Sequence, residues 1–205
     1  DENLTISTIG NKAMEDADTG DFYFSDGSFA DKSTELASWQ KAACIGVVLK
    51  KGRDDSGDLV DNGNYTLKDG TTPMQKVHGY VLALRDANGG CQWGKLWTEV
   101  GCDRNQTTGF NGYSSTQTIV AFNKDKNWNL SDAFPAVYHA VNYETVCPAP
   151  SKTSGWFLPS GGQCQYWLEN RDVILRSIQN AGGDGWKDWY CSSSEMSDSP
   201  ERNAY

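Results

Sequence analysis

Histidine and cysteine are the side chains through which this sequence could carry out covalent chemistry. Only two histidines, His78 and His139, are present, and nucleophilic catalysis needs a base beside the nucleophile. Neither belongs to a nucleophile motif, because the sequence has no G-x-S-x-G, no phosphate-binding glycine loop and no H-E-x-x-H. His78 opens an apolar segment and His139 lies in a helical pattern. We interpret both as packing or surface residues, and we predict no catalytic residue and no cofactor.

Six cysteines are present, at positions 44, 91, 102, 147, 164 and 191. None forms the closely spaced pair of a zinc site. Cys91 and Cys102 are the closest pair, separated by ten residues rich in Gly and Trp, and they are candidates for a loop disulfide in an oxidising compartment. Cys164 and Cys191 are the only late pair, for which packing or a disulfide is favoured over a reactive role. The alternative is that several of the six are reduced core thiols.

An acidic cluster, Asp54, Asp55, Asp58 and Asp61, offers oxygen ligands for a hard cation. Its spacing is not that of a calcium loop, so a solvated acidic loop is the favoured interpretation. The sequence also lacks the Glu-Pro-Asn, Gln-Pro-Asp and Trp-Asn-Asp patterns of calcium-dependent sugar binding. No metal site is predicted.

Charge and length restrict the partners and the organisation of the chain. The 205 residues include 18 basic and 27 acidic side chains, which give a net charge of −9 and repel nucleic-acid phosphates and anionic lipids. We therefore expect no nucleic-acid partner. No apolar run approaches the roughly 18 residues of a membrane helix, so this segment is not expected to insert into a membrane. The length favours one domain, preceded by an acidic leader or linker over residues 1–20.

Short apolar and aromatic runs predict the strands. We expect a strand over residues 44–49. A second, over residues 78–85, has apolar residues in near-continuous series, which is typical of a central strand buried on both faces. After a long loop-like stretch, residues 118–122 predict a further strand.

Two main helices are expected to accompany these strands. Ser131 offers an N-cap for the first, Pro135 fits its first turn, and apolar residues follow at helical spacing. The second helix is expected to begin after Ser160, to kink within residues 169–172, and to end at the glycines 182–183, which can adopt a left-handed cap.

The most distinctive motif has two halves. Residues 155–163 read Gly-Trp-Phe-Leu-Pro-Ser-Gly-Gly-Gln, and residues 189–195 read Trp-Tyr-Cys-Ser-Ser-Ser-Glu. Each half reads locally as a strand. Ser160 can cap the following helix while Gln163 reaches back as the second arm of a capping box. We expect the two halves to come together as one compact scaffold whose trailing edge is available for binding.

This motif resembles the "WYLPSAGQW … YWSSTE" signature of secreted Bacteroidetes domains with a C-type-lectin-like fold, related to the formylglycine-generating-enzyme type of that fold. The earlier segments 22–28, 45–49 and 78–87 fit the same pattern in the same order, so the resemblance runs from about Asp21 to Tyr205. Three cysteines depart from the pattern. The family often has Pro at the position of Cys44, Trp at that of Cys164, and Trp or Ser at that of Cys191.

The resemblance implies an α+β, C-type-lectin-like domain over residues 21–205, with two main helices packed on short, mostly antiparallel strands and with long loops. The family pattern continues with a further strand or two, so the resemblance also implies that the last strands are lacking here. It suggests a fimbrial tip or another extracellular, cell-surface context. In relatives, ligand contacts often follow the second half of the motif, and in some of them that segment is diversified by retroelements.

We therefore predict a cell-surface adhesion domain that recognises a glycan or protein ligand without catalysis, with pilus or surface-assembly subunits as further partners. The tryptophans would be aromatic platforms, and the polar segment after them an adaptable recognition loop. The predicted contacts are Trp186, Trp189, Glu195, Met196, Ser197, Asp198, Ser199, Glu201 and Arg202. Two alternatives stay open: an oxidase of the formylglycine-generating type, which by resemblance needs a reactive cysteine pair, and a structural module of a surface or pilus assembly.

Overall fold

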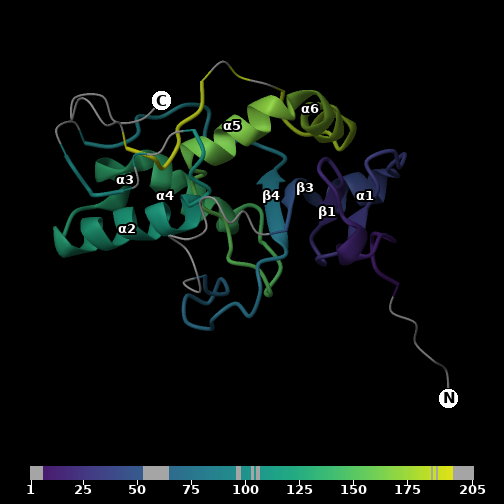
Figure 1. Ribbon diagram of the computed structural model, residues 1–205, viewed down its shortest axis with the longest axis horizontal. Coiled ribbons are helices and arrows are strands. Elements are labelled where there is room, and N and C mark those ends of the chain that lie inside the picture. The colour runs from purple at the N-terminus through teal and green to yellow at the C-terminus, as the bar shows by residue number, and fades with distance from the viewer. Residues whose placement is uncertain are drawn as a thin grey trace. The chain divides into compact units, whose positions relative to one another are not determined.

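The computed structural model describes residues 7–52, 65–95, 98–102, 104, 107–185, 187 and 189–195. Within these ranges the chain is α+β, with a small antiparallel sheet and several helices (Figure 1). Its internal contacts divide it into two compact units. The sheet unit comprises Asp1–Gly52, His78–Arg85 and Arg171–Gly185, and the helical unit comprises Arg53–Val77, Asp86–Asn170 and Trp186–Tyr205. A single domain over residues 21–205 would draw on both units, and it stays a prediction.

The strands of the sheet unit are β1 (Phe22–Phe24), β2 (Phe29–Ala30), β3 (Cys44–Lys51) and β4 (Gly79–Ala83). Their order is β2-β1-β3-β4, and every pairing is antiparallel. The strand predicted over residues 44–49 is confirmed as β3, whose first six residues are buried.

The strand predicted over residues 78–85 is also present, but its predicted central position is wrong. Within the described sheet β4 is an edge strand, and its last three residues are only half-buried. An apolar run indicates that side chains are covered, whereas a central position depends on which strands pair on both sides. That pairing is a property of the tertiary fold.

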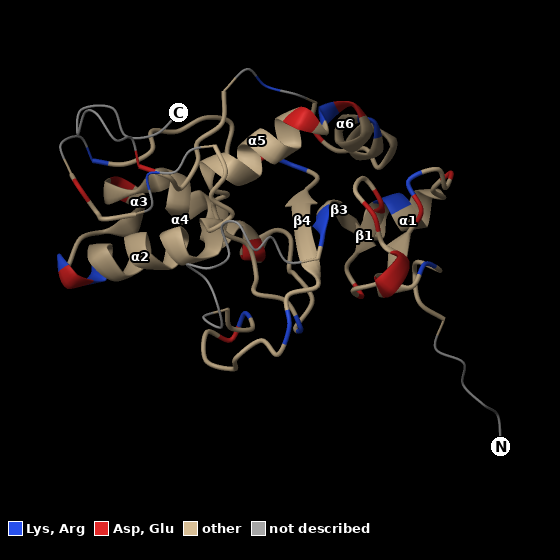
Figure 2. Ribbon diagram, in the orientation of Figure 1, with Lys and Arg blue, Asp and Glu red and all other residues tan. Residues whose placement is uncertain are grey.

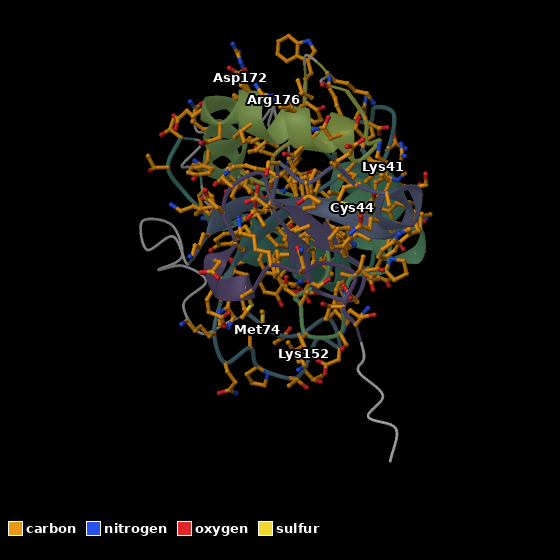
Figure 3. The ribbon with its side chains drawn as sticks, turned by 90° about the vertical axis from the view of Figure 1, so that its right-hand side faces the viewer. Lys41, Cys44, Met74, Lys152, Asp172 and Arg176 are labelled. Carbon is orange, nitrogen blue, oxygen red and sulfur yellow. The ribbon has the colours of Figure 1, made fainter. Side chains whose placement is uncertain are left out.

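Two short helices belong to this unit with the 3-10 turn Met14–Asp16: α1 (Ser38–Ala43) and α6 (Arg171–Asn180). α6 packs on β3 and buries Ile174 and Ile178. Asp172 and Arg176 project from the opposite, exposed side of the same helix (Figure 3). Gly182 follows with a φ of +79°, which confirms the predicted glycine cap.

The sequence suggests a leader or linker over residues 1–20. From residue 7 onward, this stretch packs within the sheet unit. Lys12 N donates to Phe29 O at 2.9 Å. The ammonium of Lys12 lies 2.6 Å from Asp21 Oδ2 and 2.9 Å from Asp31 Oδ2. Because the Asp21 side chain is fully buried, its charge needs this partner. The ion pairs therefore tie the N-terminal stretch to the strand that begins at residue 22.

This cluster predicts an acid-dependent loss of stability. Hydrogen bonds from Ser33 and from Lys12 hold the pKa of Asp31 well below its usual value. A carboxyl group with a lowered folded-state pKa contributes stability above its unfolded pKa of about 3.9 and loses it as the pH falls through the folded pKa. We expect the melting temperature to fall below about pH 4, and Asp31→Asn to flatten that part of the profile. Circular dichroism melts across pH test this, and identical profiles for both proteins would contradict it.

The helical unit contains α2 (Gly112–Asp125), α3 (Leu130–Ala133), α4 (Pro135–Asn142), the 3-10 turn Tyr143–Thr145, and α5 (Gly161–Glu169). α2, α3 and α4 contact one another and are the teal helices of Figure 1. Their shared core contains three side chains that are at most 1% exposed, Ile119, Phe134 and Val137.

The strand predicted over residues 118–122 is wrong, because this segment lies inside α2. The buried residues of α2 follow helical spacing, but among Gly112, Tyr113, Ser115, Thr116, Ile119 and Asn123 only Tyr113 and Ile119 have large apolar side chains. An apolar-periodicity argument therefore misses the buried face. The exposed face gives no charge signal either, since α2 is uncharged until its last turn (Figure 2).

Each of the two predicted main helices is present as two shorter ones. The first divides at Phe134 (φ −141°, ψ +67°). Its N-cap is Asn129, whose side chain accepts a hydrogen bond from the predicted cap Ser131, and Pro135 opens α4. The second divides at Asn170 (φ −108°, ψ +15°), within the predicted kink. None of the helices in the described ranges has the length and apolar character needed to cross a membrane.

Candidate functional site

The two halves of the motif, residues 155–163 and 189–195, meet in the helical unit. Ser193 N donates to Pro159 O at 2.7 Å, and Gly161 N donates to Ser194 Oγ at 3.0 Å. The predicted association is confirmed. The predicted strands are wrong, because neither half, each fully described, is a strand. A β-ladder needs successive hydrogen bonds between the backbones of two strands. Leu158 N instead donates to a side-chain oxygen, Thr116 Oγ1, at 3.1 Å.

The predicted capping box at the start of α5 is confirmed. Ser160 Oγ accepts from Gln163 N at 3.3 Å, and Ser160 N donates to Gln163 Oε1 at 2.9 Å. Both side chains are almost fully buried. Ser160 Oγ also donates to Gly109 O at 2.5 Å. The cap therefore fixes the first half of the motif against the loop that precedes α2, as well as starting a helix.

Close packing at this point requires glycine in the first turn of α5. A Cβ on Gly162 would lie 2.4 Å from Gly109 O and 2.7 Å from Gly109 N. We expect Gly162→Ala to lower the unfolding free energy by about 1–3 kcal/mol, although alanine is the better helix former. Gly89→Ala in the same unit is the control, since its Cβ would meet nothing within 4 Å. Urea unfolding curves compare the two, and equal midpoints would show that the backbone moves to admit the methyl group.

The second half of the motif passes into the core. Ser192, Ser193 and Ser194 are each at most 3% exposed. The buried indole of Trp93 donates from Nε1 to Ser192 O at 2.8 Å. Small hydroxyl side chains suit this position because they fill little space and can satisfy neighbouring backbone groups, as Ser194 does. The serine run is thus a buried support for the residues on either side.

Glu195 ends this run as a buried carboxylate, 3% exposed. Its Oε1 accepts from Val100 N at 2.7 Å, and its Oε2 accepts from Gly101 N and Cys102 N at 3.0 Å each. Consecutive backbone N–H groups stabilise an anion through their aligned dipoles. Both oxygens are engaged by the protein itself, so Glu195 acts as an anchor that a ligand would not reach.

Trp189, at the start of the same half, has the opposite environment: it is 75% exposed. The next residue, Tyr190, packs edge-to-face on Trp167 with ring centroids 4.8 Å apart, and its hydroxyl accepts from Lys187 N at 3.1 Å. The sequence analysis did not predict a role for Tyr190. The signal for it was its position next to Trp189, because neighbouring side chains in an extended segment point to opposite sides. An anchored tyrosine therefore holds an indole at the surface.

The other predicted ligand contacts lie outside the described residues: Trp186, Met196, Ser197, Asp198, Ser199, Glu201 and Arg202. The same holds for the acidic cluster that was weighed as a cation site. Among the residues that are described, no group of three or more His, Cys, Asp or Glu side chains is placed to hold a metal ion.

All six cysteines are described and none is in a disulfide. Burial raises the pKa of Cys164 to about 12 and that of Cys191 to about 11, so both stay protonated at neutral pH, whereas the thiolate is the reactive form. His78 is exposed, and the His139 ring Nε2 lies 3.1 Å from Asn88 Nδ2.

Comparisons with known proteins place the fold. The sequence matches none of the protein-family models. A protein of Bacteroides ovatus that is named as a fimbrium tip subunit is 29% identical, over 78% of this chain and 34% of its own length. The crystal structure of a fimbrial protein from Bacteroides ovatus matches with a TM-score of 0.60 and 20% identity, over 87% of this chain and 41% of that one.

This chain therefore shares the fold of a Bacteroidetes fimbrial protein, and it spans about a third of the curated relative and 41% of the solved chain. The partners and ligands of those longer proteins are not thereby those of this chain. The C-type-lectin-like description of the fold, which the sequence motif implies, stays a prediction.

Proposed function

We propose that this chain is a non-catalytic adhesion module of a fimbrial or related assembly on the cell surface, with a C-type-lectin-like scaffold, and that it binds a glycan or protein ligand. The observation that carries the proposal is Trp189, an indole that is 75% exposed on a segment whose next residues are anchored. The likeness to fimbrial proteins supports the surface location and pilus or surface-assembly subunits as further partners.

The rigidity of the support distinguishes Trp189 from an ordinary exposed apolar residue. Single exposed hydrophobic side chains are normal on protein surfaces. Here the neighbouring Tyr190 is locked on Trp167, and the serine run 192–194 is buried. A fixed aromatic surface loses little conformational entropy on binding and offers an apolar face to a sugar ring or a peptide. The arrangement therefore suits recognition without covalent chemistry.

Glu195 supports the same site indirectly. Six of the other predicted contacts, within residues 196–202, follow it directly in the chain. By binding three backbone N–H groups, Glu195 fixes where this segment starts. We assign it as a positioning residue, with the ligand contacts made by Trp189 and the segment that follows.

Two alternatives are separable. An oxidase of the formylglycine-generating type is disfavoured by the raised thiol pKa values of Cys164 and Cys191, and it would convert a cysteine in a target peptide, which mass spectrometry detects. A purely structural module is supported by the name of the solved fimbrial protein, and it would bind nothing on ligand arrays.

We expect Trp189→Ala to weaken ligand binding by about tenfold or more, because it removes the central aromatic contact. Glycan and protein arrays identify the ligand, and biolayer interferometry compares the variants. Trp39→Ala is the matched control, since this tryptophan of α1 is 60% exposed in the sheet unit. Wild-type affinity in Trp189→Ala would remove the proposed site, and blank arrays for the wild type would favour the structural module.

A further inference from the structure

Three of the cysteines gather around the second half of the motif. Cys191 Sγ lies 3.8 Å from the backbone oxygen of Cys91, across a sequence separation of 100 residues. The two side chains are also close enough for each to affect the pKa of the other thiol. Cys164 on α5 is close enough to Cys191 for an electrostatic interaction between their sulfurs. Cys102, the nearest cysteine to Cys91 in sequence, instead points its Sγ to Ser115 O at 3.6 Å.

We propose that Cys91 and Cys191 form a disulfide when the protein meets an oxidant. Each thiol loses its proton and one electron as the S–S bond forms. The two electrons and two protons pass to a disulfide-carrying oxidant, whose own S–S bond is reduced to two thiols. In the cell this oxidant would be a dithiol–disulfide protein of the envelope, and in the test tube glutathione disulfide serves.

The loop that carries Cys91 has room to complete the bond. Gly89 and Gly90 precede it, and a Cβ on either would meet nothing within 4 Å. Gly90 has a φ of +148°, in the region that favours glycine. Cys91 is also exposed, so an oxidant can reach its sulfur. A shift of this loop would bring the sulfur of Cys91 within the S–S bond length of about 2.05 Å from that of Cys191.

Cys164 is the less suitable partner for Cys191. It lies in the first turns of α5, where its backbone N donates to Ser160 O at 3.0 Å, so the helix restrains its position. Burial raises the pKa of its thiol to about 12, which leaves little thiolate for exchange. Cys91 combines access with loop freedom, and it is therefore the partner that we assign.

The disulfide would tie the segment that presents Trp189 to a loop a hundred residues earlier in the chain. Closing so long a loop restricts the unfolded chain strongly. That the protein meets an oxidant in the cell rests on the proposed surface location. The pairing of Cys91 with Cys191 does not depend on that location, so the disulfide and the proposed function can be disproved separately.

Peptide mapping tests the pairing. The full chain is reduced, equilibrated in a glutathione redox buffer, alkylated under denaturing conditions and digested without reduction. We expect a linked peptide pair that contains Cys91 and Cys191, an intact mass lower by two hydrogen atoms before alkylation, and alkylation of the other four of the six cysteines. Alkylation of all six, or a link of Cys164 to Cys191 or of Cys91 to Cys102, would overturn the proposal.

Two variants complete the test. Cys91→Ser should abolish the linked pair, and Cys102→Ser, the control, should retain it. A reducing agent should lower the melting temperature of the oxidised wild type and of Cys102→Ser, and should leave that of Cys91→Ser unchanged. Equal sensitivity of all three proteins to the reducing agent would argue against this disulfide, whatever the outcome of the ligand arrays.

Discussion

Glu195→Ala is expected to lower the unfolding free energy by about 2–4 kcal/mol. The substitution leaves the backbone N–H groups of Val100, Gly101 and Cys102 without their acceptor. A backbone donor that loses its partner away from water costs about 1–3 kcal/mol, and the sum is reduced because Gly101 is exposed to solvent. Urea unfolding followed by tryptophan fluorescence measures the change.

Two further variants interpret that result. Glu195→Gln keeps one acceptor oxygen but presents an NH₂ group to a backbone donor, so its loss should be intermediate. Glu169→Ala, at the exposed end of α5, should stay within about 0.5 kcal/mol of the wild type. If Glu195→Ala were as stable as Glu169→Ala, the carboxylate would not be the anchor of the 100–102 segment.

Phe134→Ala is expected to cost about 3–5 kcal/mol. The Phe134 side chain is fully buried and its ring meets Trp93 at 5.7 Å, Phe122 at 6.2 Å and Trp128 at 6.4 Å between centroids. Alanine would leave a cavity among rigid aromatic rings that cannot collapse into it. The unfolding midpoint in urea should fall strongly, with Val146→Ala, which is 75% exposed, as the control.

The result for Phe134 also tests the division of α3 from α4. Its backbone (φ −141°, ψ +67°) is the break between the two helices, and its ring belongs to their shared core. Phe134→Leu should retain most of the stability, because it keeps apolar volume at this position. A loss in Phe134→Leu as large as that in Phe134→Ala would mean that ring geometry, rather than buried volume, holds the two helices together.

Local signals in the sequence predicted helix ends better than strand positions. The capping box of Ser160 and Gln163 and the cap at Gly182 depend on residues within a few positions of each other, so neighbouring letters suffice. The break at Phe134 and the cap by Asn129 were missed, because alternative caps two residues apart are equally plausible from sequence. The helix over 118–122 was missed because its buried face carries Ser115, Thr116 and Asn123.

The candidate site shows the same limit at longer range. The sequence singled out Trp189 and Glu195 for one role, and the structure separates them: one is 75% exposed and the other 3% exposed. Both residue types are common at binding sites, so composition cannot distinguish them. The distinction comes from Val100, Gly101 and Cys102, whose N–H groups receive the carboxylate.

By itself, the sequence determined the α+β composition, the strand at 44–49, the capped start of α5, and the association of the two motif halves. Only the tertiary structure decided that β4 lies at the edge of the described sheet, that Glu195 is an anchor, and that Cys191 faces Cys91. The physical reason is the sequence separation between the residues that interact. Caps and periodicity depend on bonds within one or two turns, whereas burial and thiol contact depend on residues about a hundred positions away.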